Sequence, residues 1–249
     1  MNRSLLIFLL LSPVISVSQS TKLLASLDTT YVPNNEYLKE YTVDSFFESG
    51  IGDVQIDYDQ IDTALFNASL FLTINRERRS RGKEELIYEP YLDFLAYNCV
   101  KYYNRSKFRP SKKNDRLYEK NLYLAARNKS IKCHLFSVNT GMTTVLKLEP
   151  KREYHRDLDN YKSPYRLYYR NAKEIKDFPE DEVESMTYNE FAEKALKELR
   201  AKAQKKRLHS KSYEIMACFV VIDPKTMYKN RLPVAKVIQI QGARRLLKE

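Results

Sequence analysis

The sequence contains few of the residues on which several common chemistries depend. Its 249 residues include only five glycines, and none of them forms a Gly-x-Gly-x-x-Gly or Walker-type loop. The familiar glycine-rich phosphate cradles are therefore excluded, and nucleotide-dependent chemistry becomes a weak hypothesis. The only histidines are His134, His155 and His209, and none stands in a His-Glu-x-x-His motif. Any histidine-dependent catalysis must use one of these three side chains.

Cysteine is equally scarce. Cys99, Cys133 and Cys218 allow at most one disulfide and one free thiol, and they form no Cys-x-x-Cys motif. Cys99 and Cys218 lie in apolar patterns, which predicts two buried hydrophobic residues. Cys133 and His134 are a tempting catalytic pair, but neighbours on a strand point to opposite faces, so a thiolate-imidazole dyad is geometrically poor. The fold must rely on its core, for which a hydrophobic content of 43% is ample.

Long apolar runs are missing beyond the first residues, and 30% of the chain is charged, which excludes a multispan membrane protein. Residues 1–18 are different, because Arg3 precedes the apolar run Leu5–Leu11 and small serines follow. We predict a signal peptide cleaved before Gln19, and hence a secreted, periplasmic or cell-envelope protein with no integral span after cleavage. An uncleaved membrane anchor is the alternative. Cleavage removes one arginine and no acid, so the net charge changes from +11 to +10.

Hydrophobic periodicity divides the rest of the chain. Residues 19–59 contain turn signals but no sustained period, and we interpret them as an N-terminal arm. A domain over 60–249 follows, and it begins with an amphipathic helix from Ile61 that ends before Gly82, a natural C-terminal stop. A second helix is predicted to start at Pro90, where the missing N–H costs nothing.

The second half of the domain has weaker patterns. Residues 105–115 are polar and basic and predict a loop, followed by a short helix over 117–127 and a strand over 133–138. A charged, tyrosine-rich stretch at about 145–181 is broken by prolines, and we interpret it as an insertion. The last predicted elements are a helix over 188–206 and two strands over 215–222 and 234–240, paired antiparallel across Asp223-Pro224. Helices first and strands last predict an α+β fold.

Two segments of the sequence resemble a known family. The stretch from Leu72 to Ala96 resembles the opening of CAP-superfamily domains, the family of cysteine-rich secretory proteins and their bacterial SCP-like relatives. The stretch from Val237 to Gly242 resembles the last strand of that family. The resemblance is firm over 61–108, fair over 191–242, and absent in the arm and in the insertion. Its motif positions are Asn75, Arg78, Gly82, Pro90, Gln239 and Gly242.

The resemblance implies an exported α-β-α sandwich with an antiparallel sheet. Many family members hold Zn²⁺ with two histidines and two acids, but the matching positions look eroded here. The first histidine falls among residues 107–110, which include Arg109, and the last falls near Lys205. The family's Gly-Glu-Asn element matches either Glu119-Lys120-Asn121 or, with a better loop length, Ser137-Val138-Asn139, which lacks the acid. We therefore predict no metal and no cofactor.

These observations predict a binding or interaction module with a degenerate cleft. The candidate cleft or ligand-binding residues are Arg109, His134, Asn139, Glu190 and Lys205. An acid in the first turn of a helix, such as Glu190, is more often a partner of the helix dipole. The expected partner is a small apolar ligand, a glycan or a protein at the cell envelope. The alternative is a secreted hydrolase of peptides, glycans or nucleic acid that uses His134 or residues of the insertion.

The basic excess suggests a third hypothesis. Between residues 101 and 113, lysines and arginines alternate with Tyr102, Tyr103 and Phe108, a pattern that suits a polyanion such as envelope polysaccharide, lipid head groups or extracellular DNA. A solvated helix face explains the same pattern with fewer assumptions.

Overall fold

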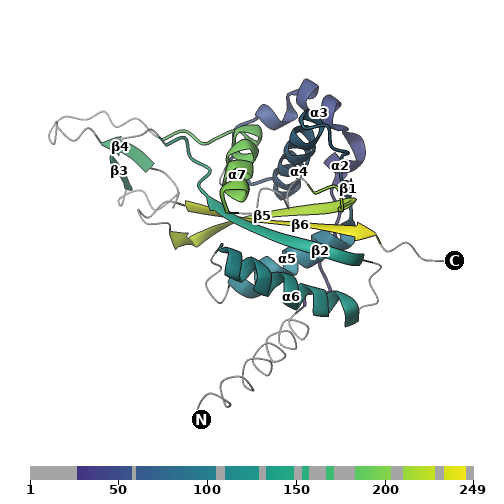
Figure 1. Ribbon diagram of the computed structural model, residues 1–249. Helices are drawn as coiled ribbons and strands as arrows, with labels where there is room; N and C mark the ends of the chain where they lie inside the picture. Colours follow the sequence, from purple (N-terminus) through teal and green to yellow (C-terminus); the bar gives the residue numbers. More distant parts are fainter. Residues whose placement is uncertain are drawn as a thin grey trace, which may run out of the picture.

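A four-stranded sheet lies between two layers of helices (Figure 1). The computed structural model describes residues 27–57, 60–104, 110–128, 133–148, 153–156, 167–170, 183–202, 210–227 and 233–244. The strands of the main sheet are β1 (Ile87–Tyr88), β2 (Cys133–Thr143), β5 (Ile215–Met227) and β6 (Pro233–Arg244), and a separate pair is formed by β3 (Glu153–Arg156) and β4 (Leu167–Arg170). The helices are α2 (Glu36–Glu40), α3 (Val43–Ser49), the 3-10 helix η1 (Ile51–Asp53), α4 (Thr63–Ser80), α5 (Pro90–Asn104), α6 (Lys112–Asn128) and α7 (Tyr188–Lys202). The predicted α+β class is confirmed.

The sheet is mixed, with the strand order β1-β5-β6-β2. The predicted antiparallel pairing of β5 with β6 is confirmed, and β6 also pairs antiparallel with β2. The expectation of a purely antiparallel sheet is wrong, because β1 runs parallel to β5 through Ile87 and Tyr88. A strand of two residues has no period to detect, and the long chain between β1 and β5 leaves both directions open.

Each face of the sheet carries a hydrophobic core, because side chains alternate along β5 and β6. α4 and α7 cover one face, where Cys218 and Val237 are buried. α5 and α6 cover the other face, where Phe219 and Ile238 are buried. Cys99, in the second core, and Cys218 are both buried and free, as predicted from their apolar surroundings.

The first two predicted helices have the expected boundaries. Asp62 caps α4, because its side chain accepts a hydrogen bond from the Leu65 amide at 2.8 Å. The helix ends at Ser80, and Gly82 then adopts a left-handed φ of 63° that favours glycine. α5 begins at Pro90, as predicted. Across the described helices, none combines the length and the apolar character that a membrane crossing requires.

Two boundaries differ from the predictions. α6 begins at Lys112, inside the predicted loop, because Ser111 caps it: the Asn114 amide donates to the Ser111 hydroxyl at 3.1 Å. β5 continues through Asp223-Pro224 to Met227, and its register with β6 shifts there. A proline has no N–H for the strand ladder, but such an irregularity tolerates it.

The two ends of the predicted insertion lie side by side. The Met186 amide donates to the Val145 carbonyl at 2.7 Å, and Leu146 forms a bridge to Ser185. Between these points the structure describes the antiparallel pair β3–β4, which lies beyond the end of the main sheet (Figure 1). The chain therefore leaves the sandwich and returns to it at one place.

The predicted arm packs on both helical layers. α3 contributes Phe46 to the core beneath α4. Closer to the N-terminus, the ring of Tyr31 stacks on Tyr97 of α5 with centroids 3.9 Å apart, and the Asp28 amide donates to Asn98 at 2.6 Å. α5 is apolar or aromatic on nearly every side, so one packed face does not cover it. The arm supplies the second cover.

Candidate functional site

A cavity of about 460 Å³ opens beside β1, within the size range of ligand-binding pockets. One wall is the loop from α4 to β1, and the other is the segment that leads into β5. The lining residues are Arg78, Gly82, Lys83, Glu84, Glu85, Ile87, Lys211, Tyr213 and Glu214. Six of these nine residues are charged, and both signs are present. The cavity is therefore suited to polar ligands.

Arg78 joins the two walls of this cavity. Its side chain is buried, with 1% of the residue exposed. Its Nε donates to the Glu84 carbonyl at 2.9 Å, while Nη1 and Nη2 donate to the Ser210 carbonyl at 3.3 and 3.4 Å. Burial lowers the pKa of Arg78 and the Glu84 carboxylate opposes this, but a guanidinium stays protonated in proteins. The charged group thus holds both walls in place.

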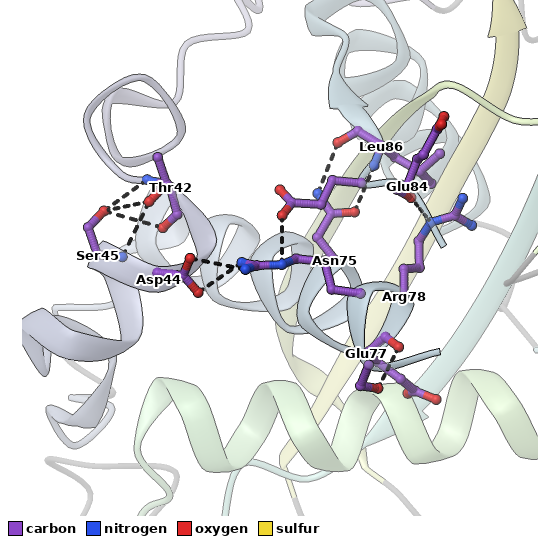
Figure 2. Close-up of polar contacts among 11 residues, drawn as sticks. Thr42, Asp44, Ser45, Asn75, Glu77, Arg78, Glu84 and Leu86 are labelled. Carbon is purple, nitrogen blue, oxygen red and sulfur yellow. Dashed lines mark hydrogen bonds and ion pairs between the residues drawn. The ribbon is translucent and has the colours of Figure 1, made fainter. Parts of the chain in front are cut away.

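Asn75, one turn before Arg78, fixes the next part of the same wall. Its Nδ2 donates to the Leu86 carbonyl at 2.9 Å, and its Oδ1 accepts from the Leu86 amide at 2.9 Å. Figure 2 shows Asn75 and Arg78 reaching from α4 to Leu86 and Glu84. Residues three apart share one face of a helix, so the motif spacing lets both side chains meet the same loop. Two predicted motif residues therefore build the cavity wall.

Ion pairs tie this region to the neighbouring helices. Arg79 forms two hydrogen bonds to the Asp44 carboxylate of α3, at 2.8 and 3.1 Å, and lies 3.3 Å from Glu85 (Figure 2 draws the bonds to Asp44). Glu77 accepts from Arg81 at 2.7 Å and from Arg200 of α7. Exposed pairs of this kind contribute little stability one by one, but together they orient α3, α4 and α7.

Asn139, a predicted cleft residue, lies inside the sandwich. It is buried on β2, and its Nδ2 donates to Gln239 Oε1 on β6 at 2.6 Å. Gln239 in turn donates to Gln241 Oε1 at 3.0 Å. The amide of Asn139 is therefore used within the sheet and is not presented to an open cleft.

Glu190, a second predicted candidate, caps α7. Its Oε2 accepts from the Thr187 amide at 2.9 Å, and its own amide donates to the Thr187 hydroxyl at 3.1 Å, which is a capping box. Desolvation acts to raise the pKa of Glu190, but the Thr187 amide and Lys147, at 3.1 Å, lower it overall. The structure therefore places Glu190 in the helix-end role that sequence reasoning favoured.

The remaining candidates are not brought together by the described residues. His134 belongs to β2, and only its backbone is described. Arg109 and Lys205 lie outside the described residues. In the predicted basic cluster, Lys101 pairs with Asp28, while Tyr103 is buried and accepts from Asn121 Nδ2 at 2.7 Å. The two aromatic and basic groups seen there are used in packing.

Sequence reasoning missed most of the cavity lining. The signals were present, because Lys83, Glu84 and Glu85 follow the Gly82 turn, and Lys211 and Glu214 precede a predicted strand. What joins these segments is the parallel pairing of β1 with β5, in which the Ile87 amide donates to the Glu214 carbonyl at 2.8 Å. That pairing has no sequence signature.

A buried carboxylate lies outside the cavity. Asp93 of α5 is 2% exposed and accepts hydrogen bonds from the hydroxyls of Tyr88 and Tyr31, the latter at 3.2 Å. Burial raises the pKa of Asp93, and the two hydroxyls oppose this only in part. Burial also raises the pKa of the Cys218 thiol, with a further contribution from Asp93. The cluster links the arm, β1 and α5.

No zinc donor set is found among the described residues. Within that part of the chain, no group of three or more histidine, cysteine, aspartate or glutamate side chains could hold a metal ion. Asn139, the described residue at a family metal position, already donates to Gln239. No chemical step is therefore assigned to a metal.

Comparison with protein-family models, with curated proteins and with solved structures found no significant match.

Proposed function

We propose that this chain is a CAP-like binding module of the cell envelope or extracellular space, and that it binds an extended segment of a partner protein in the cavity beside β1. The family assignment is supported by the chain order of α4, α5, α6, β2, α7, β5 and β6, and by the roles of the motif residues. Asn75 and Arg78 hold one loop, Pro90 starts α5, and Gln239 meets Asn139.

The observation that carries the proposal is the double attachment of Arg78. A buried guanidinium that holds both walls gives a cavity whose shape exists before the ligand arrives. Pre-formed concave sites lose less conformational entropy on binding than flexible ones. Because the hydrogen bonds of Arg78 go to main-chain carbonyls, its role is to position the site rather than to contact the ligand.

The lining favours a peptide over a small apolar ligand. Lys83 and Lys211 offer cations and Glu84 and Glu214 offer carboxylates, while Ile87, 55% exposed, is the aliphatic side chain of the cavity. A peptide segment can supply charges of both signs around an apolar side chain. β1 is also an edge strand, along which an extended chain can lie.

The proposal is tested by probing arrays of peptides and of glycans with the purified chain. We expect retention of peptides in which acidic and basic residues flank an apolar one. Charge reversal at the walls, Lys83→Glu with Lys211→Glu, should weaken binding about tenfold, the effect of losing one charge-assisted contact. The matched control is Lys197→Glu on α7, which is exposed and does not line the cavity.

Two results would count against this function. Retention of glycans alone would change the ligand class. Turnover of a library member that a chelator inhibits and that His134→Ala abolishes would replace the binding module with the hydrolase.

A further inference from the structure

The outer face of α6 carries a row of basic side chains. Over residues 113–123 its exposed residues are Lys113, Arg116, Lys120 and Tyr123, at steps of three, four and three. These steps keep all four on one side of the helix, over a length of about 15 Å. The row ends in an aromatic ring, because Tyr123 is 44% exposed.

The acids of α6 point elsewhere. Asp115 is buried and accepts from the Thr140 hydroxyl of β2, and Glu119 is half-buried. Tyr118 and Leu122 belong to the core on the same side of α6 as the sheet. The exposed side of the helix is therefore cationic, on a chain whose net charge is already +11.

The N-terminal end of the described chain lies on this same layer of the sandwich. Leu27 packs against the core beneath α5 and α6, and the Asp28 amide donates to Asn98 of α5. The apolar run Leu5–Leu11 precedes this point in the sequence. Whether it acts as the predicted signal peptide or as the alternative anchor, a membrane-inserted segment joins the domain on the α5/α6 side.

We infer that the α6 face, Lys113, Arg116, Lys120 and Tyr123, docks on an anionic phospholipid surface. The lysines and the arginine bind lipid phosphates, and Tyr123 enters the headgroup layer, where amphipathic aromatic rings are favoured. A membrane fits better than a strand of nucleic acid or glycan, because the face is the convex outer side of a helix, and the described cavity lies beside β1 instead. The inference does not depend on the peptide-binding cavity.

The test is co-sedimentation of the mature chain, beginning at Gln19, with lipid vesicles. Vesicles of phosphatidylcholine with 30% phosphatidylglycerol are compared with phosphatidylcholine alone, at low and high salt. We expect binding to the anionic vesicles only, and weaker binding as salt rises. Replacing Lys113, Arg116 and Lys120 by Gln should lower the partition coefficient on the order of a hundredfold, at about fivefold for each basic group.

Two further variants separate this face from net charge and from folding. Lys39, Arg81 and Lys197 are exposed on α2, after α4 and on α7, so replacing all three by Gln removes the same charge from the opposite layer. This control should keep anionic-vesicle binding within about threefold of the parent. Tyr123→Ser should weaken binding severalfold without changing its salt dependence. Far-ultraviolet circular dichroism checks that each variant is folded.

Three outcomes would overturn the inference: equal loss in the two triple variants, equal binding to both vesicle types, or retention on heparin or DNA without vesicle binding. Lys83→Glu with Lys211→Glu should leave vesicle binding intact, so failure of the cavity proposal is distinguishable from failure of this one.

Discussion

Replacing Arg78 by methionine tests the central feature of the cavity, the charged link between its walls. Methionine keeps most of the length and apolar volume of the side chain but donates no hydrogen bond. The Glu84 and Ser210 carbonyls each lose a charged donor. Nothing else in the contacts of Arg78 replaces that link between residues 132 positions apart.

The size of the effect follows from two opposing contributions. A hydrogen bond to a charged group contributes about 1.5–3 kcal/mol, so two bonded carbonyls correspond to roughly 3–6 kcal/mol. Burial of the guanidinium carries a desolvation cost, reflected in the lowered pKa of Arg78, and methionine removes that cost. We expect a net loss of about 2 kcal/mol in the free energy of unfolding.

The assay is urea denaturation followed by circular dichroism, since the chain has no tryptophan. The control is Arg81→Met, which breaks one ion pair with Glu77 and should cost less than about 0.5 kcal/mol because Arg81 is exposed. If Arg78→Met also costs less than about 0.5 kcal/mol, the hydrogen bonds of Arg78 merely offset its burial, and the argument that it fixes the cavity fails.

Three other predictions concern pH, close packing and helix capping. Burial raises the pKa of Asp93, so from the unfolded value near 4 up to the higher folded value the native state holds more protons than the unfolded chain, and stability falls as pH rises. Asp93→Asn should therefore gain in unfolding free energy relative to the parent between pH 4 and pH 7 in urea titrations, and a pH-independent difference would contradict this. A Cβ at Gly52 would lie 2.3–2.7 Å from the Asn189 side-chain amide, so Gly52→Ala should cost about 1 kcal/mol in thermal unfolding, and a double variant with Asn189→Gly should recover most of the packing loss. If the double variant shows no coupling, the contact is not the cause. Thr187→Ala should destabilise the protein by about 1 kcal/mol through loss of the α7 cap, and an unchanged urea midpoint would rule out the capping role of Glu190.

The parts of the fold that could be predicted are those with a repeated local pattern. α4 and α5 have long apolar stripes bounded by Gly82 and Pro90, and β5 and β6 have the residue types and length of paired strands. β1 could not be predicted, because two residues carry no period, and its partner β5 begins more than a hundred residues later.

The candidate site divides in the same way. Asn75 and Arg78 stand out because a short motif spacing places them on one helix face. Their acceptors are main-chain groups, and a carbonyl such as that of Ser210 has no residue type by which a sequence could mark it. Asn139 was expected in a cleft, yet it meets Gln239 inside the sheet, since strand register decides which face a residue occupies.

The packing of the arm has a consequence for the order in which the chain can fold. Tyr31 needs Asp93 and Phe219, and the strand that carries Phe219 leaves the ribosome roughly ten to forty seconds after the arm at ordinary synthesis rates. The first residues to be made are thus among the last to find their partners. A delay of this kind suits a segment directly behind an export signal, because an unfinished domain can still pass through a translocation pore as an extended polypeptide.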